Sequence, residues 1–315
     1  MVVISIDGLS PRYYTKEGTE KLFPTLEHFT QRGSYASGVI GVLPTLTFPS
    51  HTTLVTGATP ALHGISSNLL FDPLKRNQGG WNWFAEDIKA DTLWKAAARK
   101  GLKTGSVFWP VTVGARIDYL IPAFWRIGDS LDSVRLLRAV STPRLLEEVE
   151  ARFATFESQK MSDRDRARIG LYILQKYRPA LMLIKLSDLD RAHHVAGPNS
   201  QQAIQALQTI DRGIADVLEG IHSEGLKETT VVAIVSDHGV SPINYVFKPE
   251  VFFRQQGWLT YQGDRVTDWR AAPVIGGGLC AVVLRDPEDH LTLVAIKELF
   301  TTLMQDVAYG IRRIY

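Results

Sequence analysis

Short apolar runs alternate with amphipathic stretches along most of this chain. Apolar runs bounded by turn residues predict strands that are buried on both faces, and apolar residues at helical spacing predict helices. The predicted strands are Val2–Ile6, Thr104–Phe108, Leu181–Leu186 and Val231–Val235. The predicted helices are Thr25–Arg32, Ser50–Thr56, Thr92–Lys100, Arg164–Tyr177, Gln201–Ser223 and Leu291–Asp306.

This alternation of strands and helices favours an α/β fold with a mainly parallel central sheet flanked by helices. The 315 residues, 45% of them apolar, suffice for one large domain, and we expect a single domain over residues 1–315. The stretch from about Leu69 to Trp125 is rich in Trp, Gly and Pro. It predicts an irregular region around one strand and one helix, of the kind that often walls a substrate pocket.

The charge balance and the apolar runs exclude several partners. Thirty-five basic and 33 acidic residues leave a formal charge of +2 without a basic block, so polymeric nucleic acid is not expected. No apolar run reaches the length of a membrane span. The first residues, MVVISIDG, predict a strand and not a signal peptide. We expect a leader to have been lost, which leaves both an exported and a cytoplasmic protein open; the oligomeric state is open too.

Three predicted strands end in acidic residues. VVISIDG ends at Asp7, and LMLIKLSDLD ends at Asp188 and Asp190. TTVVAIVSDHG ends at Asp237, followed by His238. A single aspartate at a strand end is more often a helix cap or a turn former. Ligands of parallel sheets, however, bind beyond the carboxyl ends of the strands, so three such strands favour one shared site.

Histidines complete the pattern. Asp190 and His194 are separated by one helical turn and would share a helix face; His193 is the alternative partner, which this spacing disfavours. Asp237 and His238 are adjacent. Mixed carboxylate and imidazole ligands suit zinc, and also manganese or iron. Paired metal sites of this kind hydrolyse phosphate esters, so the residues favour a hydrolase with two divalent metal ions.

The segment LPTLTFPSHTTLVTG, residues Leu43 to Gly57, offers several hydroxyl groups as nucleophiles. Most of them are expected to cap turns or to lie on a helix surface, with Ser50 as the helix N-cap. His51 is expected to hydrogen-bond its own loop where the helix starts. The residues alone leave the choice of nucleophile open.

Four segments of the chain match those of a known family in order and separation. They are VISIDGL, PTLTFPSHTTLVTGATPALHGISSN, SDLDRAHHVAGP and VSDHG. They resemble the type I phosphodiesterase/nucleotide pyrophosphatase family of the alkaline phosphatase superfamily. The resemblance implies an alkaline-phosphatase-like three-layer sandwich that hydrolyses phosphodiester or pyrophosphate bonds in small, nucleotide-type substrates.

The resemblance also implies roles for single residues. Thr47 is the nucleophile and forms a phospho-threonine intermediate, with Ser50 as the alternative. Asn68, together with the backbone N–H of Thr47, stabilises a non-bridging phosphate oxygen. Two divalent metal ions, expected to be Zn²⁺, activate the hydroxyl and the leaving oxygen. The implied ligands are Asp7, Thr47, Asp237 and His238 for one metal ion, and Asp190 and His194 for the other.

One implied ligand has no counterpart here. The family's second zinc takes a further histidine from an HG motif downstream of the DHG segment. After His238 the chain has only His290, which is expected on the surface at the start of a helix. We therefore expect the chain to be truncated after Tyr315, with an incomplete second metal site. The alternative is a complete protein with one firmly bound metal.

The predicted enzyme is a phosphodiesterase/nucleotide pyrophosphatase. No arginine lies between Gly33 and Lys75, which favours diesters over monoesters, and no C/S-x-P-x-R motif indicates a sulfatase. The alternatives are a phosphonate or phosphomonoester hydrolase of the same superfamily and a catalytically silent binding protein with an incomplete metal site. Trp81, Trp83 and Trp109 are candidates for stacking on a nucleotide base.

Overall fold

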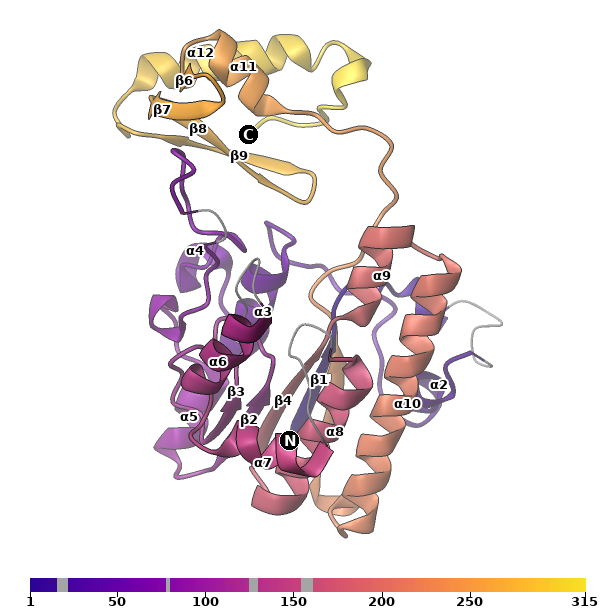
Figure 1. Ribbon diagram of the computed structural model, residues 1–315. Coiled ribbons are helices and arrows are strands. Elements are labelled where there is room, and N and C mark those ends of the chain that lie inside the picture. Colours follow the sequence, from indigo (N-terminus) through magenta and orange to yellow (C-terminus); the bar gives the residue numbers. More distant parts are fainter. Residues whose placement is uncertain (16–21, 78–79, 125–129, 154–160) are drawn as a thin grey trace. The chain divides into compact units, whose positions relative to one another are not determined.

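The chain folds into two compact units (Figure 1). The computed structural model describes every residue except 16–21, 78–79, 125–129 and 154–160. Unit 1 comprises Met1–Asn68 and Trp81–Pro242, and unit 2 comprises Leu69–Gly80 and Ile243–Tyr315. The sequence pattern does not predict this division, which passes through the Trp-rich region; Trp125 lies outside the described residues. A single catalytic domain over residues 1–315 stays a prediction.

Unit 1 is built on a parallel sheet of five strands in the order β3-β2-β4-β1-β5. Its strands are β1 (Val2–Ile6), β2 (Thr104–Val107), β3 (Tyr119–Ile121), β4 (Leu181–Leu186) and β5 (Val232–Val235). The four predicted strands are present, with ends that differ by at most one residue from the prediction. The predicted α/β class is confirmed.

Side chains alternate between the two faces of the sheet, and both faces are covered. On β1, Ile4 packs into the core formed with helices α2, α8 and α10, whereas Val3 packs into a second core with α3 and α5. Ser5 of β1 and its β4 neighbour Lys185 therefore point to the second face, near the carboxyl end of each strand. This places polar groups at the carboxyl end of the sheet, beneath α3.

Some helices of unit 1 begin at a side-chain cap. The side chain of Thr92 caps α5, that of Ser200 caps α10, and Ser162 forms a capping box with Asp165 at the start of α8. Among the described residues, no helix has the length and apolarity that crossing a bilayer needs. The helices are α1 (Arg12–Thr15), α2 (Pro24–Arg32), α3 (Thr47–Thr56), α4 (Pro60–His63), α5 (Leu93–Arg99), α6 (Ser130–Val140), α7 (Leu145–Phe153), α8 (Asp163–Tyr177), α9 (Asp188–Ala196) and α10 (Gln201–Ser223).

Unit 2 has its own small core of aromatic and aliphatic residues, centred on Phe253 and Trp258. Two antiparallel pairs of strands, β6–β7 and β8–β9, accompany two helices. Gly277 and Gly278, with φ angles of +53° and +88°, form the tight turn between β8 and β9. The elements are α11 (Pro249–Gln255), β6 (Leu259–Gln262), β7 (Arg265–Trp269), β8 (Ala271–Gly276), β9 (Leu279–Leu284) and α12 (His290–Leu303).

Candidate active site

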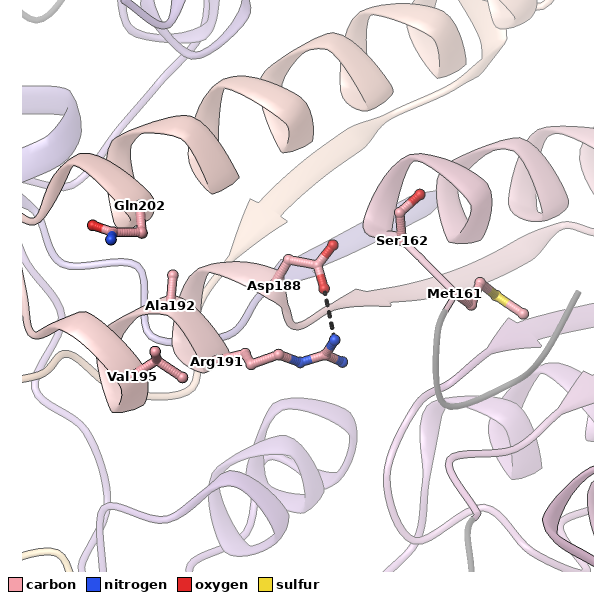
Figure 2. A pocket seen from close by; sticks show the side chains of 7 residues that line it. All are labelled: Met161, Ser162, Asp188, Arg191, Ala192, Val195 and Gln202. Atoms are coloured by element: carbon pink, nitrogen blue, oxygen red, sulfur yellow. Dashed lines mark ion pairs between the residues drawn. The ribbon is translucent and has the colours of Figure 1, made fainter. Parts of the chain in front are cut away.

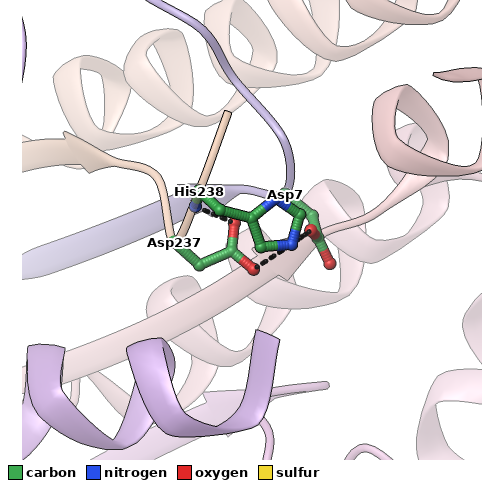
Figure 3. Close-up of side chains that lie close together, drawn as sticks. All are labelled: Asp7, Asp237 and His238. Carbon is green, nitrogen blue, oxygen red and sulfur yellow. Dashed lines mark hydrogen bonds and ion pairs between the residues drawn. The ribbon is translucent and has the colours of Figure 1, made fainter. Parts of the chain in front are cut away.

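The carboxyl ends of β1 and β5 meet in a cluster of ionisable side chains (Figure 3). β1 ends directly before Asp7, and β5 ends shortly before Asp237 and His238. Because the strands pair in parallel, these side chains emerge at the same edge of the sheet. One possible ligand atom from each of Asp7, Asp237 and His238 lies within 4.8 Å of the others. In the described part of the chain, these three residues form the one possible metal-binding cluster.

Two carboxylate oxygens of this cluster are buried without a hydrogen bond. Neither Asp7 Oδ1 nor Asp237 Oδ2 has a hydrogen-bond partner among the described residues. His238 Nε2 lies 3.4 Å from the first oxygen and 3.5 Å from the second. Buried acceptors are rarely left unpaired, and a buried carboxylate pair needs a cation. These residues therefore fit a divalent metal ion.

The two carboxylates differ in their ionisation. Burial opposes the ionisation of Asp7, but nearby positive charges, that of Lys185 first, outweigh it and hold the pKa of Asp7 well below its usual range. Burial and the negative charge of Asp7 raise the pKa of Asp237 well above its usual range. The surroundings of the pair thus favour the ionised form of Asp7 and disfavour that of Asp237, and a bound cation would favour ionisation of both.

The predicted nucleophile lies beside this cluster. His238 donates its Nδ1–H to the carbonyl oxygen of Gly239 at 3.1 Å, which leaves the lone pair on Nε2. The Nε2 atom lies 3.4 Å from the Thr47 hydroxyl oxygen. The structure therefore brings Thr47 together with the Asp7, Asp237 and His238 cluster, as the resemblance implies.

Helix α3 begins at Thr47, and its first turn faces a well-placed amide. The N–H groups of a first helical turn have no acceptors within the helix and carry the positive end of the helix dipole. The N–H of Phe48 donates to Asn68 Oδ1 at 2.8 Å, so the NH₂ group is the donor that Asn68 can offer to a ligand. Asn68 thus lies next to Thr47, and its role in holding phosphate stays a prediction.

The predicted start of α3 at Ser50 is wrong. Ser50 is buried within the helix, and Leu46 takes the N-cap position. Pro49 lies in the first turn, where its missing N–H breaks no helical hydrogen bond, so the helix begins before this proline. His51 is likewise inside the helix and not at its start.

His51 is fully buried below the cluster. Its Nδ1–H donates to the carbonyl oxygen of Thr47 at 2.8 Å, and the Ser5 hydroxyl donates to Nε2 at 2.9 Å. Burial, which disfavours the charged imidazolium, lowers the pKa of His51 to about 3. His51 is therefore a neutral side chain that ties the first residue of α3 to β1.

We expect His51 to make the protein sensitive to acid. Its folded-state pKa of about 3 lies below the ordinary value of 6.5, so the unfolded chain binds one more proton between these pH values. The free energy of unfolding therefore falls as the pH is lowered through this window. In His51→Gln, the slope of this energy against pH should decrease by about 1.4 kcal/mol per pH unit.

Urea unfolding of chelator-treated protein at several pH values between about 6 and 4.5 measures this slope. The control is His222→Gln at the exposed end of α10, which should leave the slope unchanged. An equal slope in wild type and His51→Gln would contradict a neutral, buried His51.

A second acidic pair lies on α9. Asp190 Oδ2 is 3.4 Å from His194 Nε2, so the structure brings together the pair that the spacing predicts. Burial, and then the negative charge of Asp7, raise the pKa of Asp190. His193 is instead buried and hydrogen-bonds the Tyr13 hydroxyl at 2.9 Å. The described residues provide no three-ligand group around Asp190.

His290 is exposed at the start of α12, as predicted. Its side chain, which is 75% exposed, lies 3.5 Å from Glu288. Among the described residues, no group of three possible metal ligands includes His290.

Asp163 of α8 anchors the start of α9, and the sequence analysis missed it. Its buried carboxylate accepts the N–H of Ser187 at 2.8 Å and that of Asp188 at 2.6 Å. Arg166 lies 3.0 Å from the same carboxylate. This network fixes the helix that carries Asp190. An acid in the first turn of a helix is too common to have signalled this role.

Lys185 is the other residue that the sequence analysis missed. Its Nζ lies 2.7 Å from Asp7 Oδ2, with the lysine side chain only 11% exposed. The signal was present in the sequence, because a charged residue interrupts the otherwise apolar run LMLIKL of a central strand.

The three tryptophans differ in what they can bind. Trp109 is completely buried and packs edge-on against the His51 ring at 5.0 Å, so its predicted stacking on a base is wrong. Its ring fills the core between the sheet and α3. Trp81 and Trp83 are only partly buried, with Trp81 at 5.2 Å from Phe48 beside the nucleophile. Base stacking by these two stays a prediction.

A surface pocket adjoins α9 but does not contain the cluster (Figure 2). It lies between α9 and the start of α8, and an ion pair between Asp188 and Arg191 borders it. None of the predicted metal ligands lines it. The pocket is therefore separate from the chemistry of the candidate site.

Comparison with known proteins decides the family. The family model described as type I phosphodiesterase/nucleotide pyrophosphatase matches residues 1–299. The chain belongs to this family. Mouse ectonucleotide pyrophosphatase/phosphodiesterase family member 1 is 26% identical over 247 residues, which are 76% of this chain and 24% of the mouse protein. Venom phosphodiesterase of Naja atra is 28% identical over 274 residues, which are 84% of this chain and 29% of the venom protein. The chain thus spans about a quarter of the length of these relatives.

Solved structures show the same fold as this phosphodiesterase-family chain. Murine ectonucleotide pyrophosphatase/phosphodiesterase 5 superposes with a TM-score of 0.61 at 19% identity, covering 92% of this chain and 67% of that one. An inactive threonine-to-alanine variant of the same murine protein was solved in complex with AMP. Phosphonoacetate hydrolase from Sinorhizobium meliloti gives a TM-score of 0.59 at 17% identity, covering 93% of this chain and 71% of that one. The predicted alkaline-phosphatase-like fold is confirmed.

Proposed function

We propose that the chain hydrolyses phosphodiester or pyrophosphate bonds of nucleotide-type substrates, with Thr47 as nucleophile and divalent metal ions as cofactors. The observation that carries this proposal is the position of Thr47. Its hydroxyl, at the start of α3, lies 3.4 Å from a cluster whose buried carboxylate oxygens lack partners. A hydroxyl is a weak nucleophile near neutral pH and needs such an activating neighbour.

Asp7, Asp237 and His238 would hold one metal ion, and Asp190 with His194 would contribute to a second. Zinc is the proposed metal because imidazole and carboxylate together suit it. A bound metal would supply Lewis acidity that stabilises the negative charge developing on the reacting oxygens.

The residues of the chain account for the remaining steps. The Thr47 hydroxyl gives up its proton to solvent, and its oxygen forms a bond to phosphorus while the bond to the leaving oxygen breaks, which releases the leaving group and gives a phospho-threonine intermediate. The amide NH₂ of Asn68 and the backbone N–H of Thr47 donate to a non-bridging oxygen. Water then attacks the same phosphorus and frees Thr47.

Two observations favour nucleotides as substrates. The relatives carry nucleotide pyrophosphatase in their names, and a murine structure of the same fold holds AMP. In this chain, the partly buried Trp81 lies next to Phe48 beside the nucleophile and offers an aromatic surface for a base.

The experiment that tests the proposal is metal removal and return. Treatment with a chelator should lower the hydrolysis of a nitrophenyl ester of thymidine 5′-monophosphate by about 100-fold or more. Zinc should restore the rate, whereas magnesium, which prefers oxygen ligands, should not. Hydrolysis that persists at the full rate after complete metal removal would contradict the proposal.

The same assay separates the alternatives. Phosphate release from phosphonoacetate that exceeds diester hydrolysis would support a phosphonate hydrolase. No hydrolysis of any of these esters with zinc present, together with nucleotide binding, would support a catalytically silent binding protein.

A further inference from the structure

Lys185 brings a positive charge into a site built for cations. It lies on β4, paired in register with Ser5 of β1, and the side chain points to the face of the sheet that α3 covers. Asp7 follows β1 directly, and its N–H donates to the carbonyl oxygen of Leu186 at 2.9 Å. The backbone pairing of β1 and β4 therefore fixes Lys185 next to Asp7. A lysine this deeply buried is rare unless it is paired.

The two oxygens of the Asp7 carboxylate have different neighbours. The Nζ atom lies 2.7 Å from Asp7 Oδ2 and also donates to the Ser187 hydroxyl at 2.9 Å. The other oxygen, Asp7 Oδ1, has no hydrogen bond and lies 3.4 Å from His238 Nε2. Lys185 thus pairs with Asp7 Oδ2, whereas Asp7 Oδ1 faces His238.

We propose that Lys185 is a built-in counter-ion of the metal centre, which balances the acidic cluster in the metal-free protein and weakens its affinity for a divalent cation. The inference rests on the metal site proposed above. With two acidic side chains and no cation, the buried cluster would be unbalanced, and Lys185 supplies one positive charge. Once a divalent ion binds, the ammonium group and the ion repel each other at short range in a medium that screens poorly.

If Lys185 acts through its charge, its loss should strengthen metal binding. If Lys185 acts only by positioning Asp7, its loss should weaken metal binding. Loss of a group that orients a metal ligand typically weakens metal binding by about 10- to 100-fold. Removal of a like charge from a buried site strengthens binding, and this effect is larger because the repulsion involves a doubly charged ion. Asp7 also retains the hydrogen bond from its own N–H to β4, so its backbone stays in place.

The test uses Lys185→Met, which keeps the length of the side chain and removes its charge. In a competition titration with a chromogenic chelator, this variant should bind its first zinc ion about 10-fold or more tightly than wild type. Its metal-free form should melt about 5 °C or more below wild type, and zinc should restore more stability to it than to wild type. Lys185→Arg, which keeps the charge, should bind zinc like wild type.

Lys103→Met is the matched control. Lys103 Nζ lies at the same distance, 2.7 Å, from Asp118, but its side chain is 64% exposed. This substitution should change neither zinc affinity nor the melting temperature measurably, because exposed ion pairs contribute little.

Each outcome decides one point. Equal or weaker zinc binding by folded Lys185→Met, while wild type binds zinc and hydrolyses diesters, overturns the counter-ion role alone. If Lys185→Met does not fold even with zinc, a folded Lys185→Gln that binds zinc no more tightly than wild type overturns it as well. Absence of zinc binding in wild type and in all variants overturns the proposed metal site and this inference together.

Discussion

Replacement of Thr47 by alanine is expected to lower kcat for a nitrophenyl phosphodiester by about 10⁴-fold or more. The variant lacks the oxygen that would form the covalent bond to phosphorus. Zinc binding should change by no more than about tenfold, because Asp7, Asp237 and His238 do not depend on the Thr47 side chain for their positions. Steady-state kinetics with saturating zinc, together with a zinc titration, measure both quantities.

Ser50→Ala is the control for this prediction. Ser50 lies in the same helix, and its buried hydroxyl makes no hydrogen bond to the described residues, so its loss should change kcat by no more than about threefold. Comparable rates for Thr47→Ala and wild type would remove Thr47 as nucleophile. A large loss in Ser50→Ala alone would assign that role to Ser50.

Asp237→Asn should weaken zinc binding and diester hydrolysis without lowering the stability of the metal-free protein. The Oδ1 atom of Asp237 accepts the N–H groups of Gly8 at 3.2 Å and of His238 at 3.0 Å, and an asparagine oxygen can keep both bonds. The new NH₂ group can donate to the unpaired Asp7 Oδ1, while a neutral ligand binds zinc far less well. Zinc affinity should fall by about 10³-fold, and diester hydrolysis at limiting zinc should fall with it.

The metal-free Asp237→Asn protein should be at least as stable as wild type, with a gain of about 1 kcal/mol in the free energy of unfolding. The reason is that burial and the Asp7 charge raise the pKa of Asp237, so its carboxylate is unfavourable where it stands. Chemical denaturation with a chelator present measures this energy. A strongly destabilised Asp237→Asn protein would contradict the inference that the Asp237 carboxylate is unfavourable at this position. Asp237→Ala, in contrast, should be destabilised because both hydrogen bonds to backbone N–H groups are lost.

The parallel sheet of unit 1 was predictable because its strands β1, β2 and β4 are buried along their whole length. Such strands appear as unbroken apolar runs, and β1 and β4 lie within the predicted limits. β3 is short and the strands β6 and β7 of unit 2 alternate irregularly between buried and exposed residues, so neither carries a comparable signal. The predicted start of α3 at Ser50 is too late because a proline often marks a helix boundary, although a proline is also compatible with the first turn of a helix.

The residues of the candidate site were predictable where ionisable side chains follow the end of a strand. Asp7, Asp237 and His238 follow two parallel strands, and the topology of such a sheet brings strand ends together. Lys185 and Asp163 act through partners distant in sequence, namely Asp7 and the start of α9. Such pairings depend on the register between strands and on helix packing, which a single sequence does not display.

Trapping the covalent intermediate tests directly whether Thr47 is the nucleophile. Protein turning over the nitrophenyl ester of thymidine 5′-monophosphate is quenched in acid, digested with trypsin and analysed by mass spectrometry. The peptide from Gly33 to Lys75 contains no internal lysine or arginine, so fragment ions can locate the modified residue. We expect a nucleotidyl group on Thr47 that is absent from Thr47→Ala. Active turnover without any adduct, or with the adduct on another residue, would contradict it.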